Sequence, residues 1–274
     1  MDAATVERIA DQRRADAVTM ICKAGTGHTG GTMSAMDILC VLFYDVMRYR
    51  PLEPEWADRD RFLLSKGHSV EGYLAILADC GFFPKKELRT FSQPGSNLIG
   101  HPNNKLPGVE MCSGALGHGL PIGVGMALGA QKTHRDYRTF VVMGDGELEE
   151  GSVWEAAMAG AHYDLSNLYA IIDRNGLQIS GTTEYVIGLE DLEEKWRAFG
   201  WDVAQVDGNN VRELLEYFHS AHTSEKPHCL ICRTVKGKGL PFAEGKAEWH
   251  HKVPDEAQLA QAYEALRVEG VDWA

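Results

Sequence analysis

The sequence lacks any apolar run long enough to cross a membrane. A membrane-spanning helix needs roughly 20 consecutive apolar residues, and no such run occurs in the 274 residues. The segment from Met1 to Arg14 carries charges throughout and has no apolar signal-peptide core. We therefore expect a cytoplasmic protein that does not bind membranes.

Clustered positive charge is also lacking. The 27 Lys and Arg residues are outnumbered by 39 Asp and Glu residues, so the formal net charge is −12. Because binding to phosphate backbones requires grouped Lys and Arg, we expect no nucleic-acid partner. Apolar residues make up 44% of the chain, which favours a soluble metabolic enzyme.

Cysteines are few and lie scattered in apolar segments. The six are Cys22, Cys40, Cys80, Cys112, Cys229 and Cys232. This distribution favours reduced core thiols over a disulfide framework. Cys229 and Cys232 match C-x-x-C, but they lie within a predicted strand, so we interpret them as core thiols rather than a redox or zinc motif.

No repeat, low-complexity tract or linker divides the chain, and we expect one domain over residues 1–274. Short apolar runs alternate with helical patterns in the second half. The expected strands are 139–143, 168–173, 203–206 and 229–235, and the expected helices there are 152–162, 211–218 and 256–267. This alternation predicts an α/β fold with a parallel β-sheet flanked by helices.

Helical periodicity also marks the first half. We expect a helix from about Val6 to Lys23 that ends near Gly25. A second helix follows, with a capping box formed by Ser34 and Asp37 at its start. Its apolar stripe comprises Met36, Leu39, Cys40, Phe43 and Met47.

A glycine-rich helix is expected after Leu116. Gly119, Gly123 and Ala127 are four residues apart. Small residues at this spacing allow close packing either within the domain or against another subunit. Both interpretations remain open.

Polar residues follow two neighbouring strands of the predicted sheet. Gly144, Asp145 and Gly146 come where one strand ends, and Asn175 and Leu177 follow the next. Ligands of open α/β sheets bind outside the carboxyl ends of the strands, and glycine lets the backbone approach an anion closely. A hard cation such as Mg²⁺, or Ca²⁺ or Mn²⁺ in its place, could take oxygens from Asp145, Asn175 and the Leu177 carbonyl. This arrangement resembles the thiamine-diphosphate motif, in which a metal ion anchors the cofactor's diphosphate.

Four motifs in the first half combine glycine with histidine. They are G-H-T-G-G at 27–31, S-K-G-H at 65–68, G-H-P at 100–102 and S-G-A-L-G-H-G at 113–119. In order and spacing they resemble the N-terminal domain of the transketolase family, from about Arg8 to His250. The resemblance implies the thiamine-diphosphate-binding fold, as a diphosphate-binding domain.

The resemblance also implies roles for individual residues. The implied cofactor-binding residues are His68, Gly114, Leu116, Gly144, Asp145, Gly146, Asn175 and His250. The implied catalytic residues are His28, His101 and His250, because imidazoles can donate to sugar hydroxyls and transfer protons near neutral pH. Glu150 matches an acidic residue at a subunit contact.

The resemblance further implies a partner. Family members activate the cofactor with a glutamate from a pyrimidine-binding domain, and the sequence contains no such domain. We therefore expect a separate C-terminal transketolase subunit that supplies this glutamate, in an α2β2 heterotetramer. The expected reaction moves a two-carbon ketol unit from a ketose, phosphorylated or otherwise anionic, to an aldose.

Several residues depart from the family pattern and leave the ketose undetermined. His118 stands where many relatives carry Gln, Thr29 where Pro or Ile is common, and Arg174 lies in a segment that usually reads Asp-Asn-Lys. Three other functions are alternatives: the α subunit of a 2-oxo acid dehydrogenase or decarboxylase, an inactive regulatory module, and a metal-dependent hydrolase built on the histidines. The glycine–histidine motifs are not expected in the first alternative, the 2-oxo acid dehydrogenase or decarboxylase.

Overall fold

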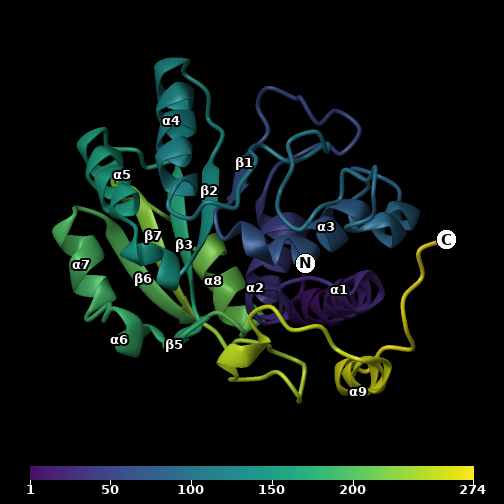
Figure 1. Ribbon diagram of the computed structural model, residues 1–274. Coiled ribbons are helices and arrows are strands. Elements are labelled where there is room, and N and C mark those ends of the chain that lie inside the picture. The colour runs from purple at the N-terminus through teal and green to yellow at the C-terminus, as the bar shows by residue number, and fades with distance from the viewer.

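A five-stranded parallel sheet forms the centre of the protein. The computed structural model describes residues 1–274, and Figure 1 shows the sheet between two groups of helices. In spatial order the strands are β1 (Arg61–Leu64), β2 (Thr139–Gly144), β3 (Leu168–Arg174), β7 (His228–Arg233) and β6 (Asp202–Asp207). A hairpin of β4 (Leu177–Gln178) and β5 (Gly181–Thr182) follows β3. The predicted α/β class with a parallel sheet is confirmed.

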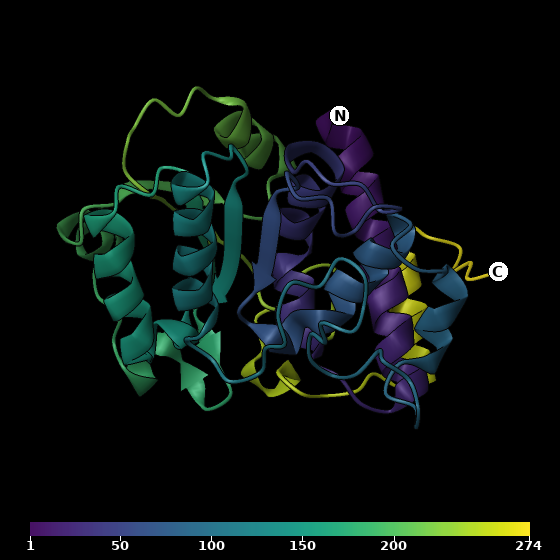
Figure 2. The same cartoon turned by 90° about the horizontal axis from the view of Figure 1, so that it is seen from above.

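Helices cover both faces of this sheet. They are α1 (Ala3–Ala24), α2 (Thr29–Val41), α3 (Val70–Asp79), α4 (Gly119–Lys132), α5 (Gly151–His162), α6 (Thr183–Val186), α7 (Leu192–Ala198), α8 (Val211–His219) and α9 (Glu256–Leu266). The views in Figures 1 and 2 place α4 and α5 on one face and α1, α2, α3 and α9 on the other. None of these helices is both long and apolar enough to span a membrane.

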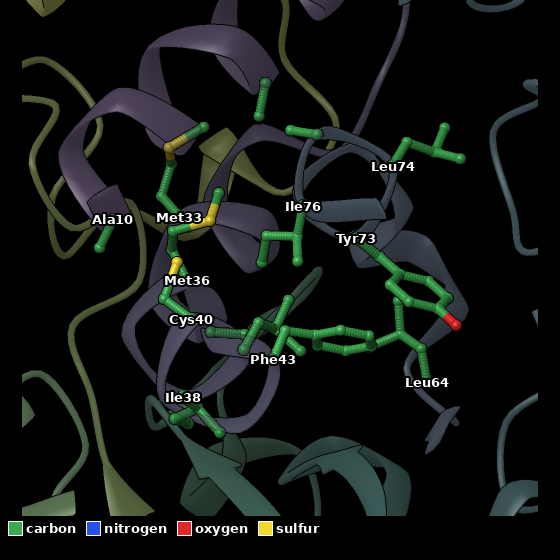
Figure 3. Packing of buried hydrophobic residues seen from close by; sticks show 14 of the residues in the cluster. Ala10, Met33, Met36, Ile38, Cys40, Phe43, Leu64, Tyr73, Leu74 and Ile76 are labelled. Atoms are coloured by element: carbon green, nitrogen blue, oxygen red, sulfur yellow. The ribbon is translucent and has the colours of Figure 1, made fainter. Parts of the chain in front are cut away.

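Alternate strand residues divide the core into two layers. Val141 and Met143 of β2 point into a cluster of 21 buried residues beneath α4 and α5, whereas Phe140 and Val142 point into one of 47 residues. Most of the core therefore lies on the side of α1, α2 and α3. Figure 3 shows that side around Phe43 and Tyr73, whose ring centres are 5.7 Å apart. Strands buried on both faces explain the continuous apolar runs in the sequence.

The first helix is confirmed, but the predicted start of the second is wrong. Asp2 caps α1 by accepting from the Thr5 N–H at 2.8 Å, and Gly25 ends it at φ +68°. Helix α2 begins at Thr29 rather than at Ser34. Ser34 and Asp37 lie inside the helix, where their side chains bond to Asp173 and Arg14 instead of capping N–H groups at a helix start.

Strand β1 and helix α3 were not predicted. The four residues of β1 pair with β2 from Arg61↔Thr139 to Leu64↔Val142. So short a strand carries little periodicity. Its position nevertheless matters for the site. Lys66 and His68 follow β1 and therefore lie at the carboxyl ends of the strands, as Asp145 does.

The small residues of α4 lie on two faces. A Cβ at Gly123 would come within 2.6 Å of the Val141 side chain, and one at Gly119 within 2.3 Å of Ser65, whereas nothing lies within 4 Å at Gly125. Close packing within the domain is therefore confirmed for Gly119 and Gly123. A subunit contact on the opposite face stays a prediction.

The cysteines are all free thiols. Cys229 and Cys232 are buried in β7 and point into different core layers, as expected for core residues three apart on a strand. Cys112 is exposed, so the core interpretation is wrong for that one.

Candidate active site

A cleft of about 360 Å³ lies at the carboxyl ends of the strands. All residues predicted for the site line it: His28, His68, His101, Gly114, Leu116, Gly144, Asp145, Gly146, Asn175, Leu177 and His250. These residues lie close together because of the register of the sheet. Gly144, Asp173 and Cys232 are paired across neighbouring strands, so the loops after β2, β3 and β7 all begin at the same end of the sheet. A larger groove of about 920 Å³ lies between α1 and the segment after α9. It contains none of the predicted residues, and its size reflects an open surface, so we assign the chemistry to the smaller cleft.

Asp145 is the buried carboxylate of the cleft. It is 3% exposed, and its two oxygens accept the Gly146 N–H at 2.9 Å and the Gly176 N–H at 2.6 Å. Burial, followed by the neighbouring Asp173 carboxylate, raises the pKa of Asp145. A cation bound to this carboxylate would favour its charged form.

Two further oxygen donors lie in the same cleft. The Asn175 side-chain oxygen accepts the Leu177 N–H at 3.1 Å, and the Leu177 carbonyl accepts from Lys236 Nζ at 3.1 Å. This carbonyl therefore already faces a positive charge. A carboxylate, an amide and a carbonyl oxygen fit a hard divalent cation, and the remaining positions of its coordination shell would be open to phosphate oxygens and water.

Arg174, a departure from the family pattern, connects Asp145 to the start of α6, which follows the hairpin. Its guanidinium lies 3.2 Å from Asp145 Oδ2 and donates to Thr183 Oγ1 at 2.6 Å and to Glu184 Oε1 at 2.8 Å. The hairpin carries Ile179, which lines the cleft and is 72% exposed.

Lys66 and Asp173 form a buried ion pair beneath the cleft. Lys66 also donates to the Gly31 carbonyl at 3.0 Å, and Asp173 accepts from Ser34 Oγ at 2.6 Å and from Thr234 Oγ1. The pair thus joins the ends of β1, β3 and β7 to α2. We did not assign either residue from the sequence, although Lys66 lies inside the S-K-G-H motif.

Lys236 is a second buried lysine that sequence analysis missed. It follows β7, is 3% exposed, and places Nζ 3.2 Å from His250 Nδ1. Burial and the positive charge of Lys66 lower the pKa of Lys236 to about 8. Lys236 therefore places a buried positive charge at the cleft, which suits an anionic ligand. The only sequence signal was the K-G-K-G segment after the last strand.

Five imidazoles gather at the cleft. The ring centre of His28 lies 5.6 Å from those of His68, His101 and His250, and 4.6 Å from that of His251. Burial lowers the pKa of His28 to about 4 and that of His250 to about 3. Both rings are therefore neutral at pH 7. No three or more His, Cys, Asp or Glu side chains are arranged to hold a metal ion.

Glu147 positions the glycine-rich loop. This buried carboxylate accepts the N–H groups of Gly117 at 2.9 Å and Gly144 at 3.1 Å, and also bonds Ser65 Oγ. Sequence analysis did not assign it to the site, since charged residues are usually exposed. Glu150 is exposed, so it is available for the predicted subunit contact.

Comparison with known proteins identifies the family. Residues 5–271 match the model of the transketolase thiamine-diphosphate-binding domain. The chain belongs to the transketolase family. Transketolases are transferases that use thiamine diphosphate. This membership disfavours the 2-oxo acid dehydrogenase alternative.

Two relatives have about the same length as this chain. The chain is 48% identical over 263 residues to one subunit of the apulose-4-phosphate transketolase of Phocaeicola vulgatus, covering 96% of this chain and 94% of that protein. It is 40% identical over 252 residues to 6-deoxy-6-sulfo-D-fructose transketolase subunit SqwG of a Clostridium species, covering 91% and 92%. Both relatives are named as subunits.

Solved transketolases contain the same fold within longer chains. The Campylobacter jejuni enzyme superposes with a TM-score of 0.95 at 29% identity, over 100% of this chain but 44% of that one. The Leishmania mexicana enzyme gives 0.91 at 31% identity, over 97% and 42%. This chain therefore corresponds to less than half of either longer chain.

Proposed function

We propose that this chain is the N-terminal subunit of a two-component transketolase that transfers a two-carbon ketol unit from a ketose to an aldose. The observation that carries the proposal is the convergence of all predicted cofactor and sugar residues on one cleft. Residues 1–274 would act as one diphosphate-binding domain in the cytoplasm, the location expected from the sequence.

Asp145, Asn175 and the Leu177 carbonyl would hold Mg²⁺, and Ca²⁺ or Mn²⁺ could take the same donors. His68, His250, Lys236 and the Gly146 N–H would bind the diphosphate. These groups are close together, since Lys236 and His250 are in contact and the ring centres of His68 and His250 are 5.1 Å apart.

The thiamine rings would lie against Gly114, Leu116 and Ile179. A Cβ at Gly114 would come within 3.2 Å of the His101 ring, so the backbone there faces the cleft directly. Thiamine diphosphate, when bound, supplies the carbon nucleophile and the electron sink for carbon–carbon cleavage.

The neutral imidazoles of His28, His101 and His250 would bind the sugar and move protons. A neutral ring has one N–H donor and one acceptor, so it can donate to one hydroxyl and take a proton from another. Low pKa values keep these acceptors free at pH 7.

A pyrimidine-binding subunit would complete the site by supplying the activating glutamate, in an α2β2 heterotetramer. The relatives named as subunits support this. Apolar side chains are also exposed on the hairpin at the cleft and in the segment after it: Ile179 is 72% exposed, Tyr185 82% and Ile187 58%. Such a patch suits contact with another chain.

The test is reconstitution. The chain would be purified alone and with its candidate partner subunit, and ketol transfer would be measured from phosphorylated and sulfonated ketoses with thiamine diphosphate and Mg²⁺. We expect activity only in the mixture, with loss of activity in Asp145→Ala and no loss in the surface control Asp58→Ala. Activity of the single chain would contradict the need for a partner. Turnover of 2-oxo acids without ketol transfer would contradict the reaction.

A further inference from the structure

Helix α2 begins at the cleft without a cap of its own. His28 precedes its first residue, Thr29, and the His28 side chain makes no capping bond. The first turn carries no acidic side chain. The N–H groups at a helix start need acceptors from elsewhere.

An acceptor comes from Glu71 in the first turn of α3. This carboxyl group is fully buried. Its Oε1 accepts the His28 N–H at 2.9 Å, and its Oε2 accepts the Thr32 hydroxyl at 2.8 Å. One side chain of α3 therefore fixes both the residue before α2 and the beginning of α2.

The loop before α2 leaves no free space around this carboxyl group. Gly27 has φ +151°, and a Cβ there would lie 2.8 Å from Glu71 Oε1 and 2.6 Å from Ile21 Cγ1. The backbone of Gly27 and His28 is thus held between α1 and Glu71. A shift of Glu71 would move His28.

Glu71 has no Lys or Arg partner. Its one ionic neighbour within 4.0 Å is His28 Nδ1 at 3.9 Å, which has no hydrogen-bond partner of its own. Burial raises the pKa of Glu71 to about 7. Burying a carboxyl group without a cation is costly, so a role in stability alone explains its presence poorly.

We infer that Glu71 is a positioning residue for ketol transfer, which fixes the backbone of His28 and thereby the orientation of its imidazole. The inference rests on the proposed sugar-binding role of His28. This ring is central to the site, since it lies 5.6 Å from each of His68, His101 and His250 between ring centres. A displacement of about 1 Å at such a position can cost about 100-fold in rate.

The test uses the reconstituted complex with Glu71→Ala, Glu71→Gln, His28→Ala and the double variant. Glu71→Ala should lower kcat/KM for the donor ketose about 10- to 100-fold, while the Kd for thiamine diphosphate stays within about twofold. Glu71→Gln keeps an oxygen acceptor for the His28 N–H and should restore most of the activity. The double variant should be no worse than His28→Ala, because Glu71 acts through His28. The exposed Glu225→Ala is the control.

Parallel losses of cofactor affinity and activity would overturn the inference, as would multiplicative effects in the double variant. A second measurement does not depend on turnover. In ¹⁵N spectra of the chain, Glu71→Ala, which removes the acceptor of the His28 N–H, should shift the His28 ring resonances and leave those of His250 unchanged. Unshifted His28 resonances would also overturn the inference. If the wild-type complex transfers no ketol unit, the proposed function fails, while the spectra still test the contact.

Discussion

The Lys236 ammonium donates to the Leu177 carbonyl oxygen at 3.1 Å, across the gap between the segments that follow β7 and β3. The contact places a cationic side chain beside an oxygen proposed for metal binding. It also indicates how the floor of the cleft attracts a diphosphate, because this ammonium is buried and has no carboxylate partner in an ion pair.

Lys236→Met should weaken thiamine-diphosphate binding about 10- to 100-fold, the usual value of a charge-assisted hydrogen bond. It should also raise the melting temperature of the cofactor-free chain, because burial of the ammonium is unfavourable, as the lowered pKa shows. Calorimetric titration and thermal unfolding measure the two effects. Lys238→Met is the control, and equal losses in both variants would contradict a specific role.

The affinity for the diphosphate should also depend on pH. Since the pKa of Lys236 is lowered to about 8, the positive charge is lost as the pH rises above 8. Wild-type affinity should fall between pH 7.5 and 9, and the Lys236→Met variant should show a flatter profile.

Asp173→Ala tests the ion pair beneath the cleft. The change would leave the Lys66 ammonium buried without its carboxylate, which typically costs about 3–5 kcal/mol in the free energy of unfolding. The exposed pair Arg135–Asp58 is a suitable comparison, and Asp58→Ala should cost less than about 1 kcal/mol. Urea denaturation of both variants measures the difference. Similar losses in the free energy of unfolding would show that the buried pair stabilises the fold no more than the exposed pair does.

Two glycines of α4 form a matched pair. Gly123→Ala places a Cβ 2.6 Å from the Val141 side chain and should cost about 1–3 kcal/mol of stability by overpacking. Gly125→Ala meets nothing within 4 Å and should stabilise the helix by up to about 1 kcal/mol. Stability is measured for the chain alone. If Gly125 lies at a subunit contact, Gly125→Leu should in addition weaken the complex.

The sequence predicts the parts of this fold that have strong periodicity or family motifs. Strands β2 and β3 are continuous apolar runs because both faces are covered, and the stripe of α8 contains Val211, Leu214, Leu215 and Phe218, all buried. Strand β1 was missed because it is short. The start of α2 was misplaced because a Ser and an Asp that serve tertiary contacts mimic a cap.

The residues of the candidate site likewise fall into those that the sequence predicts and those that it does not. Its histidines and its Asp145 and Asn175 could be named because they lie in motifs. Lys236 and Glu71 could not, and Lys66 was left unassigned although it lies in the S-K-G-H motif, since charged residues are usually exposed. Their burial depends on elements far apart in the sequence, such as the contact of Glu71 with the segment before α2. Only the assembled fold reveals these contacts.

The histidines of the cleft should make the chain sensitive to acid. Burial lowers the pKa of His28 to about 4 and that of His250 to about 3, and it lowers the pKa of His68 well below its ordinary value. In the unfolded chain these rings titrate near 6.5. The stability that depends on neutral rings is therefore complete above pH 6.5 and is lost as the pH falls through 5 towards 4. Each ring can cost at most about 1.4 kcal/mol per pH unit, and solvent screening reduces this.

Glu71 has the opposite effect on stability as the pH falls. Burial raises its pKa to about 7, so the folded chain favours its protonated form. The histidine effect is therefore isolated by comparing variants. The free energy of unfolding should fall less between pH 7.5 and 5 in His250→Gln than in the wild type, because glutamine takes up no proton. His162→Gln, at the exposed end of α5, should keep the wild-type slope. An unchanged slope in His250→Gln would mean that folding does not lower the pKa of His250, so that this ring takes up a proton near pH 6.5 in the folded chain as in the unfolded one, which would contradict its burial as a neutral ring.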